Sequence, residues 1–131
     1  MRKAWALLLG ALLSVPGWAQ SPWLDAYRVA CERWNESTEA QAYLNFVQTA
    51  PAGNLSPAEV TAFQAAAEMI HANHGWNPIE QWNTFVEWRD ALEAVIEEQP
   101  EAPNLRLVRY GIQSNAPKFL GYRAELEEDR R

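Results

Sequence analysis

The chain has 131 residues, of which 17 are acidic and 11 are basic, so its formal net charge is −6. This length suits a single globular domain with one hydrophobic core. The excess of negative charge excludes general binding to nucleic acid or to anionic lipid over the whole surface.

The first 19 residues have the pattern of a secretory signal peptide. Arg2 and Lys3 form a basic start, residues 4–15 are apolar and uncharged, and a Pro-Gly pair then interrupts the helix. We expect cleavage after Ala19 and export of residues 20–131 as one domain, either periplasmic or secreted. The apolar run is shorter than the roughly 20 residues of a membrane-spanning helix. No stable membrane insertion is therefore expected after cleavage, and a retained anchor is the alternative.

Helix-start signals recur along the rest of the chain. Ser56 followed by Pro57 and Glu59 has the pattern of a capping box, and Asn77 before Pro78 repeats the combination of cap and proline. No long β-branched run alternates with polar residues. The sequence predicts an all-α fold, a small bundle of about six helices over residues 22–35, 38–49, 57–74, 78–98 and 104–114 and from about Leu120 onward. The short, proline-bounded link at residues 100–103 predicts an antiparallel hairpin in the C-terminal half.

Apolar residues that recur at helical spacing define the expected core. The single cysteine, Cys31, falls on such a stripe between Tyr27 and Trp34, so we expect it to pack as a small core residue. Trp76, in a predicted loop, is the tryptophan expected to be exposed. In the later helices the positions expected to face inward are Ala40, Tyr43, Leu44, Val47, Val60, Phe63, Ala67, Ile70, Trp82, Phe85, Leu92, Val95 and Ile96.

Charge is unevenly distributed along the chain. Residues 102–124 contain four basic residues and no acidic one, whereas the sequence on either side is rich in acid. At 100° per residue, Arg106, Arg109 and Gln113 form one polar stripe beside the apolar face of their predicted helix. Guanidinium groups at the edge of a core need an anionic partner, because a buried unpaired charge is strongly destabilising.

Two interpretations of this arginine stripe (Arg106, Arg109 and Gln113) remain open. Carboxylates of the preceding predicted helix, from Asp90, Glu93 and Glu97, can pair with the arginines in an ion-pair network between helices. Alternatively, the stripe binds an anionic ligand such as a peptide carboxylate, a phosphate or an acidic sugar, held by the arginine forks and the Gln113 amide.

Residues of the usual catalytic and metal-binding types do not form a recognisable motif. His71 and His74 are three residues apart, so both imidazoles lie on neighbouring turns of a helix, as two metal ligands can. Without a second pair, we expect them instead to cap or hydrogen-bond the end of that helix. A glycine-rich phosphate loop and a nucleophile elbow are missing from the sequence. No metal site, cofactor or catalytic residue is predicted, and the protein is expected not to be an enzyme.

The C-terminal block resembles an uncharacterised family of small exported helical proteins from bacteria. Its pattern, RxxRxxxQxNxPxFLGY, begins at Arg106 and ends at Tyr122. Residues 74–78 (HGWNP) and 92–100 (LEAVIEEQP) resemble further blocks of that family. The resemblance carries no assigned activity. It does single out a set of candidate ligand-binding residues, namely Arg106, Arg109, Gln113, Asn115, Tyr122 and His74.

Residues 92–100 also resemble the second helix of a tetratricopeptide repeat, which ends at a proline. Trp88 and Val95 depart from that pattern, because they stand where the repeat prefers alanine. The resemblance implies a repeat-like helical hairpin, and such hairpins bind peptides or proteins. The preferred hypothesis is therefore a non-enzymatic exported protein that acts through protein or peptide contacts. The alternative is a protein that binds a small anionic ligand at the arginine stripe.

Overall fold

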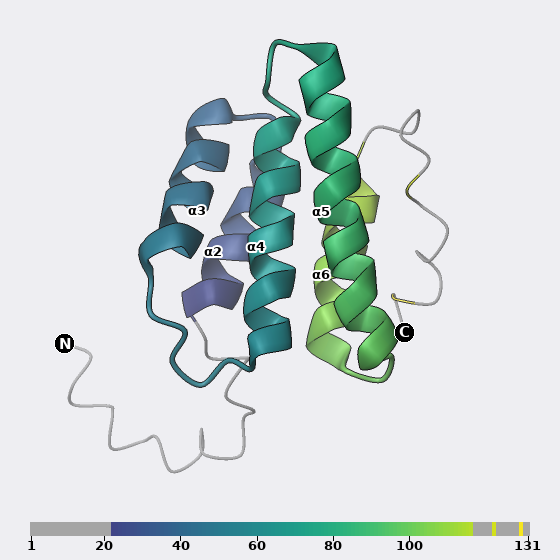
Figure 1. Ribbon diagram of the computed structural model, residues 1–131. Helices are drawn as coiled ribbons and strands as arrows, with labels where there is room; N and C mark the ends of the chain where they lie inside the picture. The colour runs from purple at the N-terminus through teal and green to yellow at the C-terminus, as the bar shows by residue number, and fades with distance from the viewer. Residues whose placement is uncertain (1–21, 117–121, 123–128, 130–131) are drawn as a thin grey trace, which may run out of the picture.

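The computed structural model describes residues 22–116 together with Tyr122 and Asp129. Residues 22–116 form five α-helices and no β-strand (Figure 1), namely α2 (Pro22–Glu32), α3 (Ser37–Thr49), α4 (Pro57–Ala72), α5 (Pro78–Glu98) and α6 (Pro103–Asn115). The all-α prediction is confirmed, and the five helices predicted up to residue 114 are all present. The helix predicted from about Leu120 and the predicted signal peptide lie outside the described residues. Within the described part of the chain, no helix combines the length and the apolar character needed to cross a membrane.

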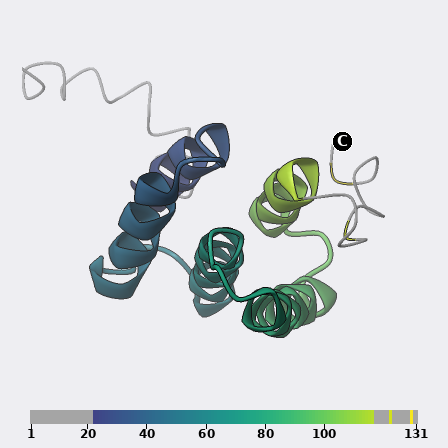
Figure 2. The same ribbon diagram turned by 90° about the horizontal axis from the view of Figure 1, so that it is seen from above.

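Helix α4 lies at the centre of the bundle and contacts each of the other four helices. Seen from above, α2 and α3 lie on one side of it and α5 and α6 on the other, so the five helices follow an arc (Figure 2). Small side chains allow this central position, since the distance between packed helices depends on the residues at their contact. Four alanines of α4 have no exposed surface, namely Ala62, Ala65, Ala66 and Ala67.

The N-terminus of α4 is fixed by the predicted capping box. The Glu59 amide donates to Ser56 Oγ at 3.1 Å, and the Ser56 amide donates to Glu59 Oε1 at 2.8 Å. These bonds satisfy two amide groups that the first turn of a helix leaves without partners. The second oxygen of Glu59 accepts a hydrogen bond from the side-chain amide of Asn104, in the first turn of α6. One carboxylate therefore joins the starts of α4 and α6.

Helix α6 turns back on α5 after the link at residues 99–102, so the predicted antiparallel hairpin is present (Figure 1). A second contact holds α6 against α2. The buried Tyr27 hydroxyl donates a 2.5 Å hydrogen bond to the Val108 carbonyl, which lies 81 residues further along the chain. Cys31 packs beside Tyr27 as a partly buried residue against the core, in agreement with its predicted role.

The predicted core is largely confirmed, with one error. Phe85, Leu92 and Ile96 of α5 are buried, but Trp82 is 46% exposed. The reason is its position along the helix. The first turns of α5 project beyond the other helices at the top of Figure 1, and Trp82, in the second turn of α5, is therefore only partly covered. Periodicity identifies the face of a helix but not where along its length the bundle ends.

Candidate binding site

Arg109 is the most deeply buried charged residue of α6. Leu105, Val108 and Ile112 form the apolar face of this helix, and each is at most 1% exposed. Arg109 lies directly beside this face and is itself only 5% exposed. A guanidinium group in this position has lost most of its water and depends on carboxylates for stabilisation.

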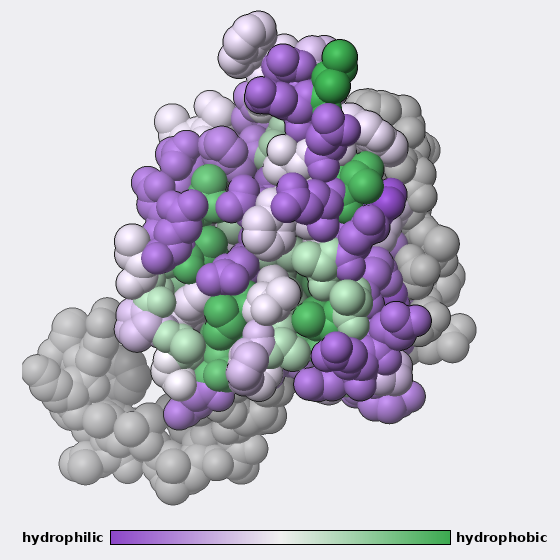
Figure 3. All heavy atoms as spheres, viewed as in Figure 1, coloured by the Kyte–Doolittle hydropathy of each residue, from purple (hydrophilic) through white to green (hydrophobic). Residues whose placement is uncertain are grey.

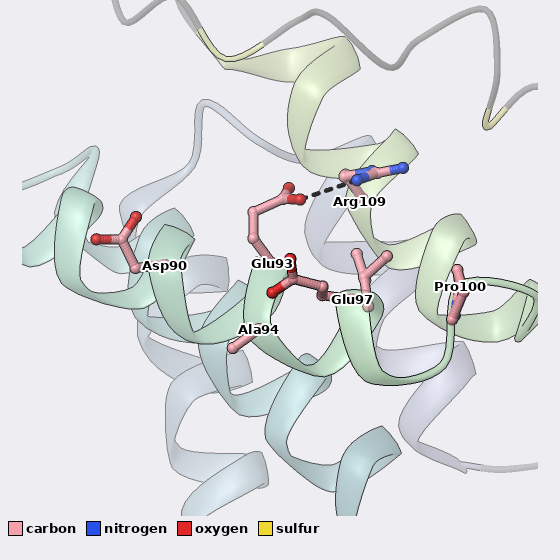
Figure 4. Close-up of a pocket in the computed structure, with 7 residues that line it drawn as sticks. Asp90, Glu93, Ala94, Glu97, Pro100 and Arg109 are labelled. Carbon is pink, nitrogen blue, oxygen red and sulfur yellow. Dashed lines mark hydrogen bonds and ion pairs between the residues drawn. The ribbon is translucent and has the colours of Figure 1, made fainter.

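Two carboxylates surround the Arg109 guanidinium group. Its Nη1 donates to Glu93 Oε1 of α5 at 2.9 Å (Figure 4). Its Nε and Nη2 donate to the two oxygens of Asp129 at 2.6 and 2.9 Å, which is a bidentate pair. The hydrogen bonds that Arg109 donates to Asp129 are the largest cause of its raised pKa, and the charge of Glu93 adds to it against the opposing effect of burial. Arg109 therefore stays fully charged and firmly held.

Arg106 and Tyr122 complete the same network. Arg106 Nε donates to Asp129 Oδ1 at 3.1 Å, so two arginines share one carboxylate whose side chain is completely shielded from solvent. The Tyr122 hydroxyl donates to the second oxygen of Glu93. Its ring meets Phe85 of α5 edge-on, with centroids 6.0 Å apart. Residues near the end of the chain therefore close the network against both α5 and α6.

The remaining candidate residues lie outside this network. Asn115 donates to the Gly111 carbonyl at 2.9 Å within its own helix. His74 Nε2 is 2.9 Å from the Trp34 carbonyl at the end of α2, and His71 Nε2 is 2.9 Å from Gln41 Oε1 of α3. Both histidines therefore form hydrogen bonds, as expected, but these go to other segments of the chain and not to the end of α4. Gln113 was expected at the polar edge of α6, but it has no exposed surface and belongs to the core.

The network matches the first interpretation of the arginine stripe, in which the arginines form ion pairs with carboxylates. Only some of these carboxylates are the expected ones. Of the three expected carboxylates, Glu93 pairs with Arg109, whereas Asp90 pairs with its neighbour Arg89 at 3.1 Å. Asp129, which contacts both arginines, was not predicted. It belongs to an acidic run at residues 125–129, and nothing in the sequence distinguishes it from the three glutamates there.

A groove of about 540 Å³ lies along α5 beside this network (Figure 4). Its acidic lining comes from successive turns of the helix, at Asp90, Glu93 and Glu97, and Arg109 contributes from α6. Ala94, Ile96 and Pro100 supply the apolar part of the lining. Glu93 is engaged by Arg109 and Tyr122, whereas Asp90 forms only a solvent-exposed pair with Arg89. Asp90 and Glu97 are therefore the carboxylates that the groove offers to a partner.

Among the described residues, no group of three His, Cys, Asp or Glu side chains is arranged to hold a metal ion. Comparison of the chain with protein-family models, with curated proteins and with solved structures found no match.

Proposed function

We propose that this is a non-enzymatic, exported helical protein that acts through contacts with a protein or peptide, and that the groove along α5 receives cationic side chains of that partner. The observation that carries the proposal is the acidic lining of an open groove at Asp90, Glu93 and Glu97. The chain as a whole is also acidic, with a formal charge of −6, which attracts a basic partner at long range.

The spacing of the groove carboxylates suggests what the partner presents. Asp90 and Glu97 are two helical turns apart, about 10 Å along the axis of α5. A peptide in the polyproline II conformation covers that distance in about three residues, and its three residues per turn bring every third side chain back to the same face. A segment with lysine or arginine residues about three positions apart would therefore reach both carboxylates, while its backbone passes over Ala94.

The resemblances noted in the sequence support the same proposal. Antiparallel helix pairs of the tetratricopeptide type bind peptides along their helices. Helices α5 and α6 form an antiparallel pair, and the groove lies along α5 beside Arg109 of α6. Membership of the exported bacterial family and export through residues 1–19 are parts of the proposal as well.

The second candidate, an anionic ligand at the arginine stripe, is favoured by one observation. Arg106 and Arg109 together hold the carboxylate of Asp129, so the pair is able to bind such a group. An external anion would have to displace Asp129, which competes from within the same chain. We therefore rank peptide binding in the acidic groove above it.

The proposal is tested by titrating the protein with two short peptides of otherwise equal sequence, one with a pair of lysines three positions apart and one with glutamates in their place. The lysine peptide is expected to bind, with an affinity that falls as salt is added. Replacing Asp90→Asn and Glu97→Gln together is expected to weaken binding about five- to tenfold, as for two exposed ion pairs.

The matched control is Glu87→Gln with Glu98→Gln, which removes the same charge from exposed positions of α5 that do not line the groove. If both double variants weaken peptide binding equally, the weakening comes from the change in net charge alone. That result would contradict a binding site in the groove. Binding of the glutamate peptide instead, abolished by Arg106→Ala, would favour the anionic ligand.

A further inference from the structure

The connection between α4 and α5 carries the most exposed apolar side chains of the described residues. Trp76 is 92% exposed and Ile79 is 73% exposed, and Trp82 adds a second partly exposed indole one turn later. We call these three residues the apolar tip. The segment that carries them projects beyond the ends of the other helices (Figure 1), and hydrophobic surface is visible at the top of the space-filling view (Figure 3).

The backbone of the tip is held by local hydrogen bonds. Asn77 caps α5 by accepting from the amides of Ile79 and Glu80 at 3.0 and 3.2 Å. The side-chain amide of Gln81 donates to the Gly75 carbonyl, which ties the loop to the first turn of α5. The two tryptophans and Ile79 are therefore exposed on a segment whose backbone is held by hydrogen bonds, namely the loop before α5 and the first turns of α5.

Charge is scarce at the tip, in contrast to the rest of this acidic chain. Between Asn73 and Val86 there is one carboxylate, Glu80, and no lysine or arginine. His74 is turned toward the Trp34 carbonyl at the end of α2. The tip thus matches a partner surface that is apolar and carries no net charge.

The exposed apolar area of the tip is too small for the tip to be the binding site of a second protein, including a second copy of this chain. A tryptophan side chain offers about 200 Å², so the three partly exposed residues provide roughly 400 to 500 Å². A stable protein interface buries about 800 Å² on each partner. The projecting shape limits how much surrounding surface could join such an interface.

Docking to a lipid–water interface does not require the contact area of a stable protein interface. Tryptophan is enriched at the level of lipid headgroups because its ring is apolar and its indole N–H remains hydrated. We propose that Trp76, Ile79 and Trp82 dock this protein onto the surface of an electrically neutral lipid bilayer. The contact is peripheral: the tip enters the interface, and none of the helices α2 to α6 is long and apolar enough to cross a membrane.

The test follows an environment-sensitive fluorophore attached at Asn83→Cys, an exposed position next to the tip, when phosphatidylcholine vesicles are added to the full chain. The control label is at Glu101→Cys, an exposed position beyond the other end of α5, whose last residue is about 22 Å from position 83 along the helix. We expect a blue shift at position 83 and none at position 101. The shift should persist in about 0.5 M salt, because apolar contacts are not screened.

Vesicle binding is then compared between the double variant Trp76→Ser with Ile79→Ser and a matched variant, Val29→Ser with Leu107→Ser. The matched variant removes exposed apolar residues from other helices. The tip variant is expected to bind about tenfold more weakly and the matched variant as wild type, since affinity follows the apolar area that enters the interface. Any binding through residues 1–19 is common to all variants.

Three results would overturn the proposal. The first is an equal response of the two labels, or equal binding by the two double variants. The second is binding that requires anionic lipid and disappears in salt. The third is a blue shift at position 83 that grows with protein concentration without vesicles, which would mean that a second copy covers the tip.

Discussion

The hydroxyl group of Tyr27 lies so close to Gly111 that a Cβ atom at position 111 would overlap it. The same Cβ would be 3.1 Å from Cys31 Sγ, so the side chains on both sides are tightly placed. Glycine at this position of α6 is therefore required by the approach of α2. The contact defines how closely the first and last described helices of the bundle can pack.

Replacing Gly111→Ala is expected to lower the free energy of unfolding by about 1–3 kcal/mol, the usual cost of overfilling a packed core. The gain in helix propensity from alanine, about 1 kcal/mol, only partly offsets this cost. Urea denaturation of the variant measures the difference. The control is Ser114→Ala, an exposed position of the same helix, where little change is expected. Unchanged stability of Gly111→Ala would show that α2 and α6 separate without cost.

The Cys31 thiol makes the stability of the fold sensitive to alkaline pH. Burial raises its pKa from 9.0 to about 11, and a hydrogen bond with Tyr27 opposes part of this rise. Between these two values the unfolded chain releases the thiol proton and the folded chain retains it. Stability due to the neutral thiol is therefore fully present below pH 9 and falls as the pH rises to about 11.

The wild-type protein is accordingly expected to lose about 2 kcal/mol more than a Cys31→Ala variant between pH 9 and pH 11. Unfolding with urea at several pH values gives this difference. The comparison with Cys31→Ala is needed because burial, the largest cause, also raises the pKa of Tyr27 and Tyr43 in both proteins. Cys31 adds to both shifts, so the difference between the two profiles contains all effects of the thiol. Parallel pH profiles for the two proteins would contradict the prediction.

Replacing Asp129 removes one anionic partner from both Arg106 and Arg109, while the hydrogen bond from Arg109 to Glu93 remains. Asp129→Asn is expected to destabilise the fold by about 1–3 kcal/mol, less than the full cost of an orphaned buried charge because Glu93 remains. Asp90→Asn is the control, since its pair with Arg89 is solvent-exposed and should contribute less than about 0.5 kcal/mol. Thermal unfolding of the two variants under equal conditions provides the measurement. Equal melting temperatures would mean that the buried network adds nothing to stability.

The capping box of α4 should be energetically significant on its own. Ser56→Ala removes the acceptor of the Glu59 amide and is expected to cost about 1 kcal/mol. Ser37→Ala serves as the comparison, because Ser37 is exposed at the start of α3, a helix whose start has no side-chain cap. Denaturant unfolding should separate the two variants clearly. A larger loss at Ser37 than at Ser56 would contradict the assignment.

Features set by neighbouring residues could be predicted from the sequence. The caps at Ser56 and Asn77 and the buried faces of α3 and α4 depend on spacing within one helix, and they are present as expected. The exposure of Trp76 followed in the same way from a loop between two helix signals.

Features that depend on which segments meet in space could not be predicted. The sequence does not distinguish Asp129 from its acidic neighbours, and its contact with Arg106 and Arg109 of α6 follows no local pattern. Trp82 was assigned to the core because its helical phase is suitable, whereas its exposure depends on how far α5 projects. The hydrogen bond from Tyr27 to Val108 likewise joins residues that share no local pattern.

The shielded carboxylate of Asp129 has a practical consequence for the surface between α5 and α6. Two cationic side chains there have one anion near the end of the chain as their common counterion. Trimming the protein after Ala116 would remove that counterion together with the phenol of Tyr122, and the local electrostatic potential would shift toward positive. The specificity of a shortened protein would then differ from that of the intact one, even with every helix from α2 to α6 in place.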